Sequence, residues 1–203
     1  QIAVKGLRAA YDGIFLPLFG AHQATNAAVA VAAVEAFAAP KEGEDGLDPE
    51  LVRTALSAVS SPGRLEIVRT SPTVLVDAAH NPAGMAATGE AVRESFTFDR
   101  LVGVVAVLAD KDAEGILEPL EPLLDEIVVT VNSSPRALPV DRLRETAEAV
   151  FGPDRVHAAL RLDDAIDQAV ALAERDAEFG GGGVLITGSV VTAGDAIHLL
   201  KKE

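Results

Sequence analysis

The chain of 203 residues contains no cysteine and no tryptophan, and only 4% of its residues are aromatic. Without cysteine it can form neither a disulfide nor a thiolate zinc site, and its four histidines are too scattered for a metal-ligand spacing. Basic residues are scarce: 17 Lys and Arg against 31 Asp and Glu give a charge of −14, which argues against nucleic-acid or anionic-membrane binding. The most apolar long run, 27–39, is interrupted by Glu35 and is too short to span a bilayer. We therefore expect a cytoplasmic protein that binds neither nucleic acid nor membranes.

Apolar residues make up 49% of the sequence, and most of them are Ala, Val and Leu, which suits buried parallel strands covered by Ala-rich helices. From residue 61 onward, apolar runs alternate with segments of helical pattern. The expected strands are 74–77, 101–108, 126–131, 155–158 and 184–187, and the expected helices are 82–95, 113–120, 140–150, 162–174 and 190–200. Such repeated units predict an α/β fold with a Rossmann-like, largely parallel, doubly wound sheet.

The first 60 residues lack this regular alternation. The elements expected there are strands 2–4 and 14–18 around a turn at 11–13, a helix from 21 to near Pro40, a charged loop 41–48 and a helix 49–59. We interpret residues 1–60 as the end of one domain and residues 61–203 as a second domain.

Polar loops follow four of the expected strands, at the edge of the sheet where doubly wound folds bind ligands. These loops are 77–81, 109–112, 132–136 and 187–189. His80 stands just before a helix whose first backbone amides can meet a phosphate. Lys111 offers a point charge to a phosphate or carboxylate, and Ser189 offers a hydroxyl. The sequence therefore predicts an anion-handling site that gathers residues from distant parts of the chain.

Each of these residues also has a purely structural interpretation. Ser189 suits the N-cap of a helix, Lys111 can belong to a solvated loop, and Arg64 can be an exposed residue in a Pro-Gly turn. Segments 96–100 and 180–183, at the opposite edge, are interpreted as simple connectors. His157 and His198 lack partners in the sequence pattern, and we treat both as structural.

Five segments taken together give the chain a resemblance to a known family. They are GAHQATNA at 20–27, SPGRLE at 61–66, VDAAHNPAG at 76–84, DKD at 110–112 and ITGS at 186–189. In this order and spacing they resemble the carboxy-terminal part of folylpolyglutamate synthase/dihydrofolate synthase, within the Mur ligase superfamily.

The resemblance implies an ATP- and Mg²⁺-dependent ligase in which ATP phosphorylates the carboxylate of a pteroate or folate and the amine of L-glutamate attacks the acyl phosphate. It further implies that a Rossmann-like carboxy-terminal domain follows a central ATPase domain in the sequence. We expect the enzyme to be a monomer. Asn26, Arg64 and Asp77 fall at positions that hold ATP in the family. His80 falls near the transferred phosphate, and Lys111 and Ser189 fall where glutamate or the acyl phosphate is handled.

Two departures from the family pattern bear on these expectations. The sequence has no G-x-x-x-x-G-K-[ST] motif, so the P-loop, the magnesium ligands and most of the pterin pocket are expected upstream of Gln1, and this part alone is expected to be inactive. Val190 and Val191 stand where relatives commonly carry an aromatic residue. A peptidoglycan-type Mur ligase and a non-catalytic nucleotide- or glutamate-binding module remain alternatives, and the choice between dihydrofolate and polyglutamate synthesis stays open.

Overall fold

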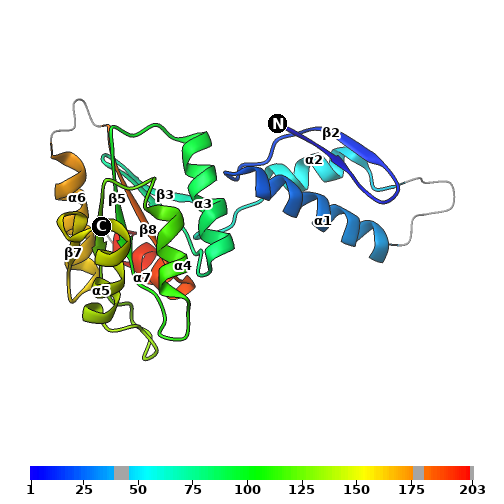
Figure 1. The fold of residues 1–203 in the computed structure, drawn as a ribbon. Helices are drawn as coiled ribbons and strands as arrows, with labels where there is room; N and C mark the ends of the chain where they lie inside the picture. The colour runs from blue at the N-terminus through cyan, green and yellow to red at the C-terminus, as the bar shows by residue number, and fades with distance from the viewer. Residues whose placement is uncertain (39–45, 176–180, 202–203) are drawn as a thin grey trace. The chain divides into compact units, whose positions relative to one another are not determined.

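A computed structural model describes residues 1–38, 46–175 and 181–201, which belong to two compact units, 1–61 and 62–203 (Figure 1). The border between the units lies one residue after the predicted domain boundary. Most of the predicted loop 41–48 and Gly180 lie outside the described residues. Within the described part of the chain, no helix combines the length and apolarity needed to cross a bilayer.

The first unit joins an antiparallel pair, β1 (Ile2–Lys5) and β2 (Ala10–Ile14), to two helices, α1 (Ala21–Phe37) and α2 (Pro49–Ser57). Both helices were predicted, and Asp48 caps α2 by accepting a hydrogen bond from an amide of its first turn. The predicted strand 14–18 and the turn at 11–13 are wrong. Residues 11 and 14 point into the core of this unit, and the chain reverses earlier, at 6–9.

A buried carboxylate ties the hairpin of the first unit to α1. Glu35 is 1% exposed and accepts hydrogen bonds from the amides of Leu7 and Arg8 and from the Tyr11 hydroxyl, the last at 2.6 Å. The hydrogen bond from Tyr11 lowers the pKa of Glu35, while burial raises the pKa of Tyr11. This contact therefore fixes the hairpin with a charge that is stabilised inside the unit.

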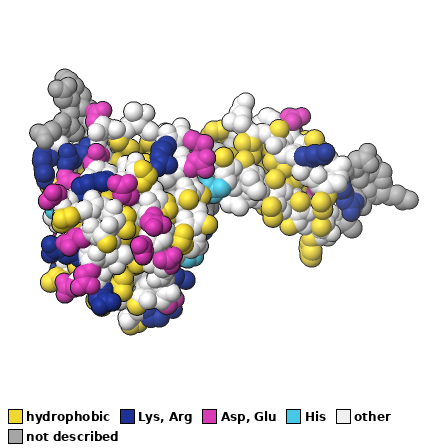
Figure 2. Space-filling model, viewed as in Figure 1, with side chains coloured by type: hydrophobic (Ala, Val, Ile, Leu, Met, Phe, Trp, Pro, Cys, Tyr) yellow, Lys and Arg dark blue, Asp and Glu magenta, His cyan; other side chains and the backbone are white. Residues whose placement is uncertain are grey.

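The other side of α1 is apolar and exposed. Val29, Val34 and Phe37 are 64%, 51% and 94% exposed, and hydrophobic side chains are prominent on the visible face of this unit (Figure 2). Helices that are apolar all round are normally buried in a larger assembly. This is consistent with the prediction that residues 1–60 are the end of a larger domain, which stays a prediction.

The second unit holds a six-stranded sheet in the order β3-β4-β8-β5-β6-β7. Its strands are β3 (Glu66–Thr70), β4 (Thr73–Val76), β5 (Arg100–Val105), β6 (Glu126–Val129), β7 (Val156–Ala158) and β8 (Gly182–Thr187). All neighbours run parallel except β3, which pairs antiparallel with β4. The largely parallel α/β fold is confirmed. Strand β3 was not predicted, because this edge strand is largely exposed and has no continuous apolar run.

Helices cover both faces of this sheet, as its strand order requires. The helices are α3 (Pro82–Ser95), α4 (Ala113–Leu117) with the 3-10 turn η1 (Glu118–Leu120), α5 (Val140–Phe151), α6 (Leu162–Glu174) and α7 (Val190–Leu200); a second 3-10 turn, η2 (Pro153–Arg155), precedes β7. The chain moves in one direction from β4 to β7 and then returns to β8. Since such crossovers are right-handed, α3 to α5 lie on one face and α6 on the other, where α6 and α7 share one apolar core with the strands.

Residues 96–99 connect α3 to β5 without regular secondary structure, as predicted, but the connector interpretation was wrong for Gly182 and Gly183. Gly182 and Gly183 are buried inside β8. A Cβ atom on Gly183 would lie 2.5 Å from the Phe98 ring, so glycine lets this ring pack against the strand. Phe98 in turn stacks on Phe96, with ring centroids 5.8 Å apart. Phe96, Phe98 and Gly183 therefore pack together near the amino ends of the strands.

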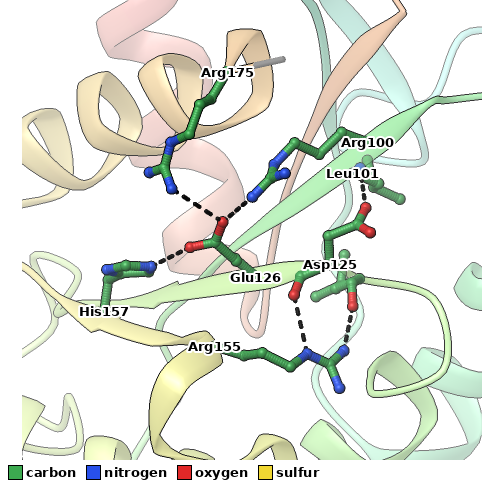
Figure 3. Close-up of polar contacts among 8 residues, drawn as sticks. Arg100, Leu101, Asp125, Glu126, Arg155, His157 and Arg175 are labelled. Atoms are coloured by element: carbon green, nitrogen blue, oxygen red, sulfur yellow. Dashed lines mark hydrogen bonds and ion pairs between the residues drawn. The ribbon is translucent and has the colours of Figure 1, made fainter. Parts of the chain in front are cut away.

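A buried ion cluster lies at the same edge (Figure 3). Glu126, 7% exposed at the start of β6, contacts Arg100 and His157 at hydrogen-bond distance and Arg175 at 3.8 Å. Burial raises the pKa of Glu126, but the hydrogen bonds from His157 and Arg100 outweigh it and hold the pKa below its usual value. The expectation that His157 has no partner was wrong, because the partner lies 31 residues away on the neighbouring strand.

Candidate active site

The loop after β4 is built around the carboxylate of Asp77. One oxygen accepts a hydrogen bond from the amide of Leu65 at 3.0 Å, and the other accepts from the Ala79 amide at 2.9 Å and the Thr88 hydroxyl at 2.8 Å. Asp77 is only 4% exposed. In this structure the carboxylate is occupied by the chain itself, so Asp77 joins the segment before β3, the end of β4 and helix α3. Its direct contact with ATP stays a prediction.

Arg64 lies in the segment that Asp77 holds. The Gly63 carbonyl accepts from the amide of Ala78 at 2.8 Å, and the Gly63 amide donates to the Glu66 carboxylate at 2.9 Å. Leu65 has a φ of 47°, a left-handed conformation that is unfavourable for leucine and that its neighbours stabilise here. The exposed Arg64 side chain is thereby carried to the same sheet edge as the loop after β4.

His80 is anchored by one of its two ring nitrogens. Its Nδ1 donates a hydrogen bond to the carbonyl of Ala78 at 3.0 Å, because a carbonyl oxygen can only accept. In the neutral ring, Nε2 is then the nitrogen with a free lone pair. Asn81 caps α3 by accepting from the Gly84 amide at 2.8 Å, and Pro82 occupies the first turn of this helix, whose range agrees with the predicted 82–95. The first turn of α3 therefore begins directly after a half-buried histidine.

A pocket of about 260 Å³ opens at this edge of the sheet. Its lining comes from the loops after four strands, β4, β8, β5 and β6, and consists of His80, Leu108, Asp110, Lys111, Arg136, Ser189, Val190 and Val191. The structure thus gathers three of the predicted site residues, His80, Lys111 and Ser189, around one space. Sequence reasoning found the loop that carries Arg136 but did not single out this residue.

The charged groups of the pocket are only loosely paired. Asp110 lies 3.9 Å from the Lys111 ammonium and 3.7 Å from the Arg136 guanidinium, and all three side chains are at least one-third exposed. Ion pairs of this length and exposure contribute little to stability. The pocket therefore offers two cations and one carboxylate to a ligand, in a protein whose overall charge is strongly negative.

Ser189 shapes the pocket from a buried position. It is 2% exposed, caps α7 by accepting from the Thr192 amide at 2.9 Å, and accepts from the Asn132 side-chain amide at 3.1 Å. The Thr192 hydroxyl donates to the carbonyl of Ala106, so the Ser189 proton goes to Thr192. Gly188, at a φ of 107°, lets this turn approach Ala106, where a Cβ would lie 2.7 Å from the carbonyl oxygen. The N-cap interpretation of Ser189 is confirmed, and its contact with substrate stays a prediction.

Asn26 lies in the first unit, on α1. Its side chain is exposed and donates to the Gln23 side chain at 3.1 Å. Its contribution to the site formed by the second unit stays a prediction. Among the described residues, no three or more His, Asp or Glu side chains are grouped so as to hold a metal ion.

Residues 63–190, more than half of the chain, match the family described as "Mur ligase, glutamate ligase domain". The chain belongs to the Mur ligase family. The pocket agrees with the fold of this domain, because doubly wound sheets bind ligands at the carboxyl ends of their strands.

Three matches, one curated protein and two solved structures, illustrate the similarity. Dihydrofolate synthase/folylpolyglutamate synthase of Mycobacterium tuberculosis is 49% identical over all of this chain and 43% of its own length. A crystal structure of the M. tuberculosis folylpolyglutamate synthase complexed with ADP and AMPPCP matches with a TM-score of 0.90 and 51% identity, over 98% of this chain and 44% of that one. Escherichia coli FolC in complex with DHPP and ADP matches with a TM-score of 0.79 and 25% identity, over 98% and 43%. The chain therefore spans less than half the length of these relatives.

Proposed function

We propose that this chain is the glutamate-binding part of an ATP-dependent ligase that adds L-glutamate to dihydropteroate, to a folylpolyglutamate or to both. The observation that carries the proposal is the convergence of His80, Lys111 and Ser189 on one pocket with a second cation, Arg136. Two cations suit a substrate with two carboxylates. The M. tuberculosis relative, 49% identical, is named dihydrofolate synthase/folylpolyglutamate synthase, which supports this substrate class.

The 51% identical M. tuberculosis folylpolyglutamate synthase has a crystal structure complexed with ADP and AMPPCP, which supports the use of ATP. In the proposed reaction, a carboxylate oxygen of the pteroate attacks the γ-phosphorus of ATP, and the bond from that phosphorus to the ADP oxygen breaks. The amine nitrogen of glutamate then bonds to the acyl carbon, and phosphate leaves with the electron pair of the carbon–oxygen bond. The extra proton on nitrogen passes to a base or to water.

The residues of the pocket suit these steps in different ways. The Nδ1–H of His80 is held by a carbonyl, so it is the imidazolium form of the ring that also carries a proton on Nε2 and can donate it to an oxygen of the transferred phosphate. Lys111 attracts a carboxylate of glutamate or the acyl phosphate. Ser189 is buried and holds the start of α7 in place, so we assign it to the shape of the pocket and to backbone contacts there.

The nucleotide is assigned to the other predicted residues. Arg64 is exposed at the same sheet edge and can reach a phosphate or stack on a base. Asp77 acts by holding the Arg64 segment, because its own oxygens are occupied. Asn26 is proposed to contact ATP from the first unit, which we interpret as the end of an ATPase domain.

Magnesium has no fitting site on the described part of this chain, because no suitable group of acidic or histidine side chains occurs there. We therefore propose that the magnesium ligands lie in another part of the full-length protein, which corresponds to the portion of the relatives that this chain does not span. We also propose a cytoplasmic enzyme, since the reaction consumes ATP. We propose a monomer, as expected from the family resemblance.

A substrate comparison tests the proposed function. The full-length protein should form product from ATP, labelled glutamate and dihydropteroate or tetrahydrofolate, and a UDP-sugar peptide should neither replace nor inhibit the pteroate. Ligation of the UDP-sugar peptide instead would favour a peptidoglycan-type Mur ligase. Binding of ATP and glutamate without any product would favour a non-catalytic module and contradict the proposal.

A further inference from the structure

The loop that carries Arg136 is held in place on both sides. On one side it pairs with the segment after β5: the Arg136 carbonyl accepts a hydrogen bond from the Ala109 amide at 2.8 Å, and the Leu138 amide donates to the Val107 carbonyl at 2.9 Å. At the other side of the loop, the Ser133 amide and hydroxyl both donate to the carboxylate of Asp195 on α7, at 2.8 and 3.0 Å. The backbone of Arg136 is therefore fixed at the rim of the pocket.

Asn132 adds a second connection between this loop and α7. Its side-chain amide donates to the hydroxyl oxygens of both Ser189 and Thr192, at 3.1 and 3.0 Å, and its carbonyl oxygen accepts from the Ser134 amide. Asn132 is 8% exposed, so these hydrogen bonds are shielded from water. The loop after β6 and the start of α7 therefore form one braced wall of the pocket.

The guanidinium of Arg136 is available to a ligand. Its side chain is 67% exposed and lies 3.7 Å from Asp110, which is longer than a good charge-assisted hydrogen bond. By contrast, Arg155 places all three of its guanidinium nitrogens on Glu121, Asp125 and Leu124. Arg155 is thus a structural arginine, whereas Arg136 keeps its forked donors for a carboxylate.

The strand order fixes the sequence of groups along the pocket. The loop after β4 carries His80, the loop after β8 carries Ser189, the loop after β5 carries Lys111, and the loop after β6 carries Arg136. Neighbouring strands lie about 4.8 Å apart, so the strand order places the loop of Lys111 between the loops of His80 and Arg136. A substrate that reaches from His80 to Arg136 therefore passes the loop that carries Lys111.

We infer that Arg136 is a specificity residue that binds the side-chain carboxylate of the incoming glutamate. This inference rests on the proposed function and assigns one end of its substrate. The α-carboxylate, next to the reacting amine, lies beside Lys111, and the distal carboxylate pairs with the guanidinium fork of Arg136. Asp110, which lies near both cations, offsets their mutual repulsion and attracts the amino group of glutamate. A neutral amide in place of the distal carboxylate loses the charged pair, so the pocket selects glutamate over glutamine.

Amino-acid selectivity of the full-length protein tests this assignment. For Arg136→Gln we expect the KM for glutamate to rise about 10- to 100-fold, the range for losing a hydrogen bond to a charged group. The KM for ATP and for the folate should stay within about twofold, because the inference assigns Arg136 to glutamate alone. The ratio of kcat/KM for glutamate over glutamine should fall by a similar factor of about 10 to 100, and Arg136→Lys should restore part of it.

Arg142→Gln is the matched control, since Arg142 is a comparably exposed arginine on α5, paired at 3.9 Å with Glu145 and outside the pocket. It should leave the KM for glutamate and the selectivity ratio unchanged, and the melting temperatures of both variants should match that of the parent. If the wild-type protein ligates glutamate but Arg136→Gln leaves the selectivity ratio unchanged, this inference is overturned and the proposed function stands. Absence of glutamate ligation by the wild-type protein would overturn the proposed function and this inference with it.

Discussion

Replacing Glu126 by alanine should lower the free energy of unfolding by about 3 kcal/mol, because it leaves partly buried cations without their anion. Arg100 and His157 contact this carboxylate directly, and the side chains of both are less than one-third exposed (Figure 3). Arg100 contacts Glu126 through Nη2, and its buried Nε has no hydrogen-bond partner among the described residues. Truncation therefore removes the group that holds the starts of β5, β6 and β7 together. Urea unfolding, followed by circular dichroism, measures the loss.

A surface carboxylate provides the control for this experiment. Glu145 is 71% exposed and lies 3.9 Å from Arg142, so Glu145→Ala should change the free energy of unfolding by less than about 0.5 kcal/mol. An equally small effect of Glu126→Ala would contradict the structural importance assigned to the cluster.

The acid dependence of stability gives the Glu126 experiment a second readout. The pKa of the folded carboxyl lies below its ordinary value of 4.5, so the folded state releases this proton more readily than the unfolded state. The resulting stabilisation is complete above pH 4.5 and is lost as the pH falls through the lowered pKa. The difference in stability between wild type and Glu126→Gln should therefore shrink below pH 4.5. A constant difference down to low pH would contradict this account.

Replacing His80 by alanine should give the largest loss of activity. We expect kcat of the full-length protein to fall about 10²- to 10³-fold, as for other residues that stabilise charge developing in a transition state. The physical reason is that the Ala78 carbonyl holds Nδ1–H and fixes the ring at the pocket, so that the imidazolium form can direct its second proton, on Nε2, at the phosphate. Initial rates of ADP formation with dihydropteroate and glutamate measure the effect.

His198→Ala is the matched control for His80, because His198 lies on α7 and does not line this pocket. It should retain kcat within about twofold. The melting temperature of His80→Ala should also stay near that of wild type, since the lost hydrogen bond is local. A full rate in His80→Ala would contradict the assignment of the pocket to phosphate transfer.

Helix boundaries were the most predictable part of the fold. The bounds of α3, α6 and α7 agree with the prediction residue for residue. For α3 and α7 the reason is local, because the capping residues Asn81 and Ser189 immediately precede these helices in the sequence. By contrast, β2 was misplaced, since its residues 11–13 carry a turn signal that core packing of Tyr11 overrides.

Long-range pairing was the part that the sequence could not supply. Glu126 and His157 meet because β6 and β7 are neighbours, and nothing in either segment indicates the other. Arg136 was missed for the same reason, since its importance comes from the loop after β5 that pairs with its backbone. The site loops were nevertheless predictable, because parallel strands bring all their carboxyl ends to one edge of the sheet.

Transfer of ¹⁸O from the carboxylate of dihydropteroate to inorganic phosphate tests the central claim most directly. The full-length protein, given labelled dihydropteroate, ATP and glutamate, should release phosphate that carries one ¹⁸O atom for each amide formed, because the carboxylate oxygen leaves with the phosphoryl group. Glutamate-dependent product with unlabelled phosphate, or no glutamate-dependent product at all, would contradict the assignment of this chain to an acyl-phosphate glutamate ligase.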